Sequence, residues 1–195
     1  MIRLNAILRR ARAVRQDESG SIAVETLLMV PLLAWAFVST LAYFDAYRAE
    51  AISTKASLTI ADMISRETGF VTDEYLSGAE NLLEFLTIDD DDADLRVTVI
   101  RWDEDDSKYY VVWSRERGPR EDLVDADLTL LTGQLPILAN NERIIVVETW
   151  TDYTPAYSVG LSEYTLKTWD FIRPRFTNQL CYKPLEATPD DDAVC

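Results

Sequence analysis

A long apolar segment near the N-terminus is the feature that most limits what this chain can fold into. From Ser21 to Phe44 the sequence reads SIAVETLLMVPLLAWAFVSTLAYF, in which Glu25 is the one charged residue. As a helix these residues would extend roughly 36 Å at 1.5 Å per residue, enough to cross a hydrocarbon core of about 30 Å. An isolated span must satisfy its backbone polar groups internally, so a helix is the expected form. We therefore predict a transmembrane helix over residues 21–44.

Charge is distributed unevenly on the two sides of this segment. The 195 residues carry a net charge of −15. Residues 1–20 hold five arginines against two acidic residues, a net charge of +3, which leaves −17 for residues 45–195. Basic flanks of a span stay in the cytoplasm. We expect a basic cytoplasmic arm over 1–20 and an acidic body on the other side of the membrane.

The composition excludes several classes of function. The chain contains no histidine, which is the commonest general base and metal ligand. A Ser-His-Asp hydrolase, a His-ligated zinc site and a His-ligated haem are therefore excluded. The acidic balance argues against a nucleic-acid partner, because phosphate binding relies on Lys and Arg. No spacing of residues marks a nucleophile with its base, so we expect no enzyme, no cofactor and no metal site.

Two residues distinguish the span from a plain hydrophobic anchor. Pro31 removes a helix hydrogen bond and is expected to kink the helix. Glu25 places a carboxylate a few residues inside the cytoplasmic end. It either snorkels to water or pairs with a specific cation, and the residues alone leave both interpretations open.

A secretory signal peptide is the competing interpretation of the segment. Thr40-Leu41-Ala42 has the form of a small-x-small cleavage site. A signal peptide has an apolar region of about 7–15 residues, however, and this run is longer and contains both Glu and Pro. The length favours a retained span.

The junction between the arm and the span carries a resemblance to a known family. The stretch from Gly20 to Leu33 reads GSIAVETLLMVPLL. It looks like a prepilin-type processing site, with Gly20 before the scissile bond and Glu25 at the fifth mature position. It also resembles the N-terminal signature of the TadE/TadG-like pilus-assembly family, in which the glutamate precedes a proline by six residues, as Glu25 precedes Pro31. Residues 143–155, RIIVVETWTDYTP, are similar to the family's late strand.

The resemblance implies a structural role and a location. Members of the family are pseudopilin-like, single-span proteins of the tight-adherence (Flp-type) pilus machinery of bacteria. The chain would then be a minor pseudopilin-like subunit in the bacterial inner membrane, with a cytoplasmic N-terminus and a periplasmic C-terminal domain. Its partners would be other pilin, pseudopilin and pilus-assembly subunits. Thr26 stands where pilins of this system often have an aromatic residue, and TadG-like members are often unprocessed, so cleavage stays open.

If cleavage occurs, the resemblance makes the chain a substrate of a prepilin peptidase. A cut between Gly20 and Ser21 would remove the arginines and create an α-amine that is largely cationic at neutral pH. That amine could pair with Glu25 of a neighbouring subunit and set the axial register, or with Glu25 of its own helix, four residues away. The sequence does not choose between these pairings. The alternative function is an unprocessed, membrane-tethered periplasmic binding or scaffold module.

The first part of the body is predicted to be helical. No Gly or Pro occurs between Pro31 and Gly69, so the helix should continue past the membrane and end with Gly69 as its C′ residue. Its apolar stripe is formed by Ala49, Ile52, Ala56, Ile60 and Met63. A second helix is expected over Asp73–Leu86, with Thr72 as N-cap and a buried face formed by Tyr75, Ala79, Leu82 and Leu86.

The pattern then becomes that of strands. Residues 95–102 and 108–113 predict a β-hairpin, and 143–151 and 164–172 predict two further strands, with a short helix over 122–131 between the pairs. Short polar connections favour an antiparallel sheet covered by helix on one face. The expected fold class is α+β: a long N-terminal helix, transmembrane in its first half, packed on about four antiparallel strands with a second helix, as in pilins.

The last predictions concern the acidic loop and the tail. Asp89–Asp92 lack the spacing of an EF-hand and indicate a solvated loop. Cys181 and Cys195 are the only cysteines, and in an oxidising compartment they should form a disulfide that closes the acidic tail. The resulting organisation is an arm or leader (1–20), a span (21–44), a periplasmic domain (45–180) and a disulfide-closed tail (181–195).

Overall fold

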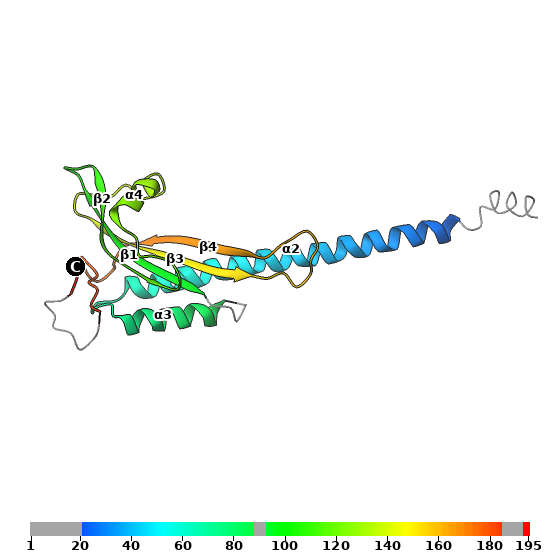
Figure 1. Cartoon of the computed structure of the whole chain (residues 1–195), viewed down its shortest axis with the longest axis horizontal. Helices are drawn as coiled ribbons and strands as arrows, with labels where there is room; N and C mark the ends of the chain where they lie inside the picture. The colour runs from blue at the N-terminus through cyan, green and yellow to red at the C-terminus, as the bar shows by residue number, and fades with distance from the viewer. Residues whose placement is uncertain (1–20, 88–92, 185–192) are drawn as a thin grey trace, which may run out of the picture. The chain divides into compact units, whose positions relative to one another are not determined.

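The computed structural model describes residues 21–87, 93–184 and 193–195 and has the predicted α+β fold (Figure 1). The predicted acidic loop at Asp89–Asp92 and the arm with Gly20 lie outside these residues. The helices and strands, in chain order, are α2 (Ser21–Ser65), α3 (Asp73–Leu86), β1 (Asp94–Asp103), β2 (Lys108–Arg117), α4 (Asp125–Leu131), β3 (Arg143–Tyr153) and β4 (Tyr164–Ile172).

The chain divides into two compact units. One contains the residues up to Phe44 together with Ala156–Leu161, and the other contains Asp45–Pro155 and Ser162–Cys195. Helix α2 is continuous through the boundary, with 45 residues and a length of roughly 68 Å. Pro31 lies inside this helix, which continues on both sides of it. A kink at Pro31 stays a prediction.

Four antiparallel strands form one sheet in the order β2-β1-β3-β4. The β1–β2 hairpin is the predicted one, and β2 runs four residues further than expected, to Arg117. Strand β3 pairs with β1 from Arg143 opposite Arg101 to Trp150 opposite Asp94. The connection after β2 therefore carries the chain past β1 to the far side of the hairpin.

One face of the sheet packs against α2 and α3 and forms the larger core. Strands β1 and β3 contribute alternating buried residues, as the pleat requires. The helices meet them with Ile60, Ile64, Leu76 and Leu83, each at most 1 % exposed. The buried side of α2 carries many small residues: Ala46, Ala49, Ser53, Ala56, Ser57 and Ala61 are buried.

The other face of the sheet carries a second, smaller core under α4, where the sequence predicted helix on one face only. Ile100, Ile144 and Val146 pack there against Leu128 of α4 and against Leu135 and Leu138 of the following loop. A register shift between Val99 and Ile100 in the β1–β2 ladder marks a bulge.

The C-terminal end of α2 differs from the prediction. The helix ends at Ser65, and the next two amides donate to carbonyls three residues back, Arg66 to Met63 and Glu67 to Ile64. The amide of Arg175, from the segment after β4, donates to the Ser65 carbonyl at 2.8 Å. A tertiary contact thus satisfies the helix end, and Gly69 is not its C′ residue.

The buried faces of the helices overlap those predicted without being identical to them, and Ala49, Ala56 and Ile60 of α2 are buried as predicted. On α2, Ser53 and Ile64 are buried, whereas Ile52 and Met63 lie half-buried at the border. On α3, Leu76, Ala79 and Leu83 are buried, and the predicted Tyr75, Leu82 and Leu86 flank them. The predicted N-cap is confirmed, since the Thr72 hydroxyl accepts a hydrogen bond from the Tyr75 amide at 3.2 Å.

Helix α4 starts three residues later than predicted because side chains at and before its start accept hydrogen bonds from the edge strand of the sheet. The Asp122 carboxylate accepts a hydrogen bond from the Glu116 amide at 2.8 Å, and Asp125 accepts one from the Val111 amide at 2.6 Å. These amides belong to β2, the outermost strand. The two carboxylates thereby occupy backbone donors that would otherwise be open to another strand.

The turn after β2 offers a direct test of this arrangement. Gly118 has φ +137°, and a Cβ there would lie 2.7 Å from Cγ of Asp94, whose carboxylate pairs with Arg120. We expect Gly118→Ala to cost about 1–3 kcal/mol of unfolding free energy, because it combines backbone strain with an overlap. Denaturant unfolding of the full chain in detergent, followed by tryptophan fluorescence, measures this.

Gly133→Ala is the matched control, since a Cβ there meets no atom within 4 Å and the backbone φ is not positive. We expect it to change the unfolding free energy by less than about 1 kcal/mol. Equal losses for the two variants would contradict the role given to Gly118.

Candidate functional site

The first half of α2 is the principal candidate site. Its large apolar side chains are exposed in every direction, including Ile22 (77 %), Leu27 (73 %) and Phe37 (65 %). A soluble surface helix is apolar on one stripe, whereas a helix that is apolar all round is suited to lipid or to other apolar helices. Among the described residues, α2 is the one helix long and apolar enough to cross a membrane.

The polar side chains of this segment are compatible with an apolar environment. The hydroxyls of Thr26, Ser39 and Thr40 each donate to the carbonyl four residues earlier, at 2.7–2.9 Å. Such bonds remove the need for water at these positions. Glu25 differs, because its carboxylate is exposed and makes no hydrogen bond or ion pair with any residue of the described ranges.

The structure places on one helix three of the residues predicted for processing, register or a helix kink. Ser21, Glu25 and Pro31 all belong to α2. Gly20 lies outside the described residues, so cleavage beside it stays a prediction.

The predicted disulfide is present between Cys181 and Cys195. It closes a short chain segment, a constraint worth on the order of 3 kcal/mol. The residues beside it form a small ladder: the Val71 amide donates to the Cys181 carbonyl, and Tyr182 and Val194 exchange two hydrogen bonds of 2.8 Å. The bridge therefore holds the C-terminus against the connection between α2 and α3.

Tyr182 fixes this tail to the body. Its ring is 2 % exposed and lies 4.3 Å from the guanidinium of Arg115, and its hydroxyl donates to Asp73 at 2.7 Å. Burial raises the pKa of Tyr182. Burial also acts to raise the pKa of Asp73, but hydrogen bonds from Tyr182 and Arg117 outweigh it and lower that pKa overall.

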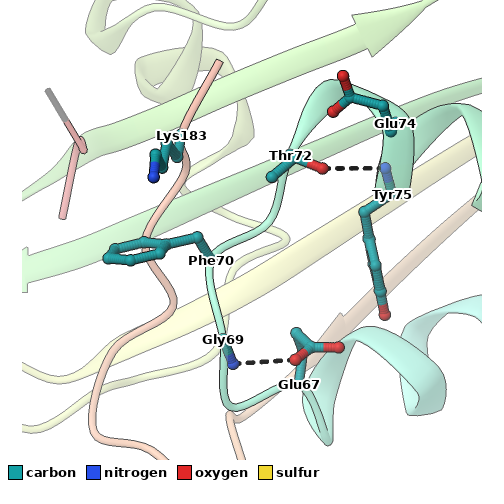
Figure 2. A pocket seen from close by; sticks show the side chains of 7 residues that line it. All are labelled: Glu67, Gly69, Phe70, Thr72, Glu74, Tyr75 and Lys183. Atoms are coloured by element: carbon teal, nitrogen blue, oxygen red, sulfur yellow. Dashed lines mark hydrogen bonds between the residues drawn. The ribbon is translucent and has the colours of Figure 1, made fainter. Parts of the chain in front are cut away.

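A pocket of about 530 Å³ lies beside this tail (Figure 2). Lys183 enters it from the C-terminal segment, and the other lining residues come from the α2–α3 connection and the first turn of α3. The Lys183 ammonium lies 5.4 Å from the centre of the Phe70 ring. The pocket is lined by Glu67, Gly69, Phe70, Thr72, Glu74, Tyr75 and Lys183.

Tyr75 and Glu67 are two ionisable residues of this pocket whose surroundings are defined. Burial, with a smaller contribution from the charge of Glu67, raises the pKa of Tyr75 to about 12, so its phenol is neutral at physiological pH. The Glu67 carboxylate accepts hydrogen bonds from the amides of Thr68 and Gly69, both at 2.9 Å. Within the described part of the chain, no group of three or more Cys, Asp or Glu residues is placed to hold a metal.

A buried carboxylate on the sheet was missed by the sequence interpretation. Glu148 of β3 is 1 % exposed; its Oε2 accepts from Nε of Arg96 at 2.7 Å, and its Oε1 lies 3.2 Å from Nζ of Lys167. Trp150 lies beside them, with the Arg96 guanidinium 5.1 Å and that of Arg120 4.2 Å from its ring centre. The signal was present in the sequence, since a lone charge within the apolar run IIVVETW requires a partner.

Comparisons with protein-family models, with curated proteins and with solved structures find no match to this chain. The class of the protein rests on its fold and on the exposed apolar helix: it is an α+β domain that carries, within the described residues, one helix able to span a membrane.

The ion pairs of Glu148 predict unequal losses of unfolding free energy when Glu148 and Lys167 are each replaced by alanine. We expect Glu148→Ala to cost about 3–5 kcal/mol of unfolding free energy, because it leaves the 13 %-exposed Arg96 side chain without its counter-ion. Lys167 is 50 % exposed, so Lys167→Ala should cost less than about 1 kcal/mol. Denaturant unfolding measures both, and a loss as small for Glu148 as for Lys167 would contradict a structural ion pair.

Proposed function

We propose that this chain is a membrane-anchored structural subunit, a minor pseudopilin-like component in the assembly of a tight-adherence type IV-like pilus. The observation that carries the proposal is the continuity of α2. One helix is exposed and apolar over its first half and packed on a four-stranded sheet over its second half. This is the construction that the family resemblance of Gly20–Leu33 implies.

The anchoring half supports the proposal through its chemistry. Residues 21–44 match the thickness of a bilayer core, and three of their hydroxyls are satisfied within the helix. The five arginines of residues 1–20 favour a cytoplasmic N-terminus, so the disulfide-bearing body would lie in the oxidising periplasm. In this proposal the membrane is the bacterial inner membrane.

Glu25 is the residue to which the proposal gives a specific task. It is the one charge within 21–44 and has no partner among the described residues. A carboxylate in that position is costly unless it meets a cation or water. In an assembly, the cation would be the α-amine of Ser21 on a neighbouring subunit, formed when a prepilin peptidase cuts after Gly20.

The proposal assigns no catalytic role to the body. Glu148, the most buried carboxylate described above, is neutralised by Arg96 and Lys167 and does not line the pocket beside Lys183. The body would instead supply the surface by which the subunit meets its partners.

Substitution of Glu25 tests the proposal. In a host with the prepilin peptidase and the pilus machinery, Glu25→Ala should still insert into the membrane, because the change removes a charge from the span. Its incorporation into assembled filaments or assembly complexes should fall by about tenfold, the equivalent of about 1.4 kcal/mol per contact. Immunoblots of membrane and sheared-filament fractions measure both quantities.

Glu50→Ala is the matched control, an exposed glutamate on the same helix outside the predicted span, and it should assemble normally. Intact-mass measurement of the mature chain, with and without the peptidase, shows whether residues 1–20 are removed. Assembly of Glu25→Ala at the level of the unaltered chain would contradict the proposal. An intact N-terminus with no incorporation of the unaltered chain would favour the tethered binding module instead.

A further inference from the structure

The connection between β3 and β4 is unusual in this acidic chain. Residues 154–162, TPAYSVGLS, contain no charged side chain, although the chain as a whole has 27 % charged residues. Asp152 lies two residues before the stretch, and Glu163 follows it directly. A connection exposed only to water does not need the Tyr, Val and Leu side chains that this uncharged loop carries.

The contacts of this loop group it with the apolar half of α2. Ala156–Leu161 belong to the same compact unit as the residues up to Phe44. One side of the last turns of that segment is covered, since Ala42 is 4 % exposed and Val38 and Ser39 are half-buried. The loop therefore lies at the level of the last turns of the predicted span.

The loop also presents an aromatic side chain outward. Tyr157 is 56 % exposed, close to the exposure of Tyr43 (46 %) and below that of Phe44 (72 %) on the helix. A tight turn holds it, with the Val159 amide donating to the Tyr157 carbonyl at 3.0 Å and Gly160 at φ +98°. Val159 and Leu161 are half-buried beside it.

These features point to one environment. Tyrosine is favoured at the membrane–water interface, where its ring is in the acyl boundary and its hydroxyl in water. The open backbone of a loop is not tolerated in the hydrocarbon core, so the loop belongs in the headgroup layer. The absence of carboxylates suits that layer, because anionic headgroups would repel the acidic side chains found elsewhere in the body.

We propose that the β3–β4 loop, with Tyr157 at its tip, is a second membrane contact that lies in the headgroup layer beside the end of the α2 span. The inference rests on the proposed membrane anchoring of α2.

A depth measurement on the full chain tests this. Ser158→Cys is labelled with nitrobenzoxadiazole without reductant, so that Cys181 and Cys195 stay in their disulfide. The protein is reconstituted into phosphatidylcholine vesicles that contain a fraction of doxyl-labelled lipid, and flotation establishes that it is inserted. Ser107→Cys is the matched control, an exposed serine in the β1–β2 turn.

For Ser158→Cys we expect a blue-shifted emission that is strongly quenched by doxyl groups near the headgroups and weakly by doxyl groups deep in the chains. The Ser107→Cys label should show neither effect. Inserted protein whose Ser158→Cys label stays unquenched overturns the loop contact alone. A blue shift without quenching means that protein, such as a second copy, covers the loop, and it also overturns the inference. Failure of the chain to float overturns the membrane anchoring as well.

Discussion

The structure depends on one helix that must satisfy two different surroundings. In its first half α2 exposes apolar side chains on every side, and in its second half it buries a strip of small residues against the sheet. Ala49, Ala56 and Ser57 belong to this strip, and each is at most 7 % exposed. Because no break separates the halves, whatever holds the first half also holds the folded body.

The body secures the ends of its elements by tertiary contacts. The α2 end receives the Arg175 amide, the β2 edge is occupied by Asp122 and Asp125, and Cys195 ties the tail to the α2–α3 connection. Two of these devices use segments far away in sequence. Among the described residues, most of the large apolar side chains that stay exposed lie on the first half of α2.

Periodicity predicted the architecture well. The four strands, the N-cap at Thr72 and the pairing of Cys181 with Cys195 were predicted from residue patterns, and the structure bears them out. Two of the errors have a similar cause, since each depends on a contact with another element of the fold. Gly69 does not cap α2 because Arg175 does, and α4 begins after Asp122 because that carboxylate serves β2.

Within the candidate sites the same division holds. A local motif singles out Glu25 and Pro31, whose roles stay predictions, whereas the cluster around Glu148 needs the register of three strands to bring Arg96 and Lys167 together. The pocket beside Lys183 likewise joins a tail residue to the start of α3. The spacing of these residues along the chain does not predict that they lie together.

The central claim is that α2 crosses a membrane and delivers the acidic body to the side opposite the arginines. It is tested most directly by fusing alkaline phosphatase or a green fluorescent protein after Cys195 and assaying carbonate-washed inner membranes. We expect a carbonate-resistant protein with active phosphatase and a dark fluorescent fusion. A soluble full-length chain, or a bright fusion with inactive phosphatase, would contradict it.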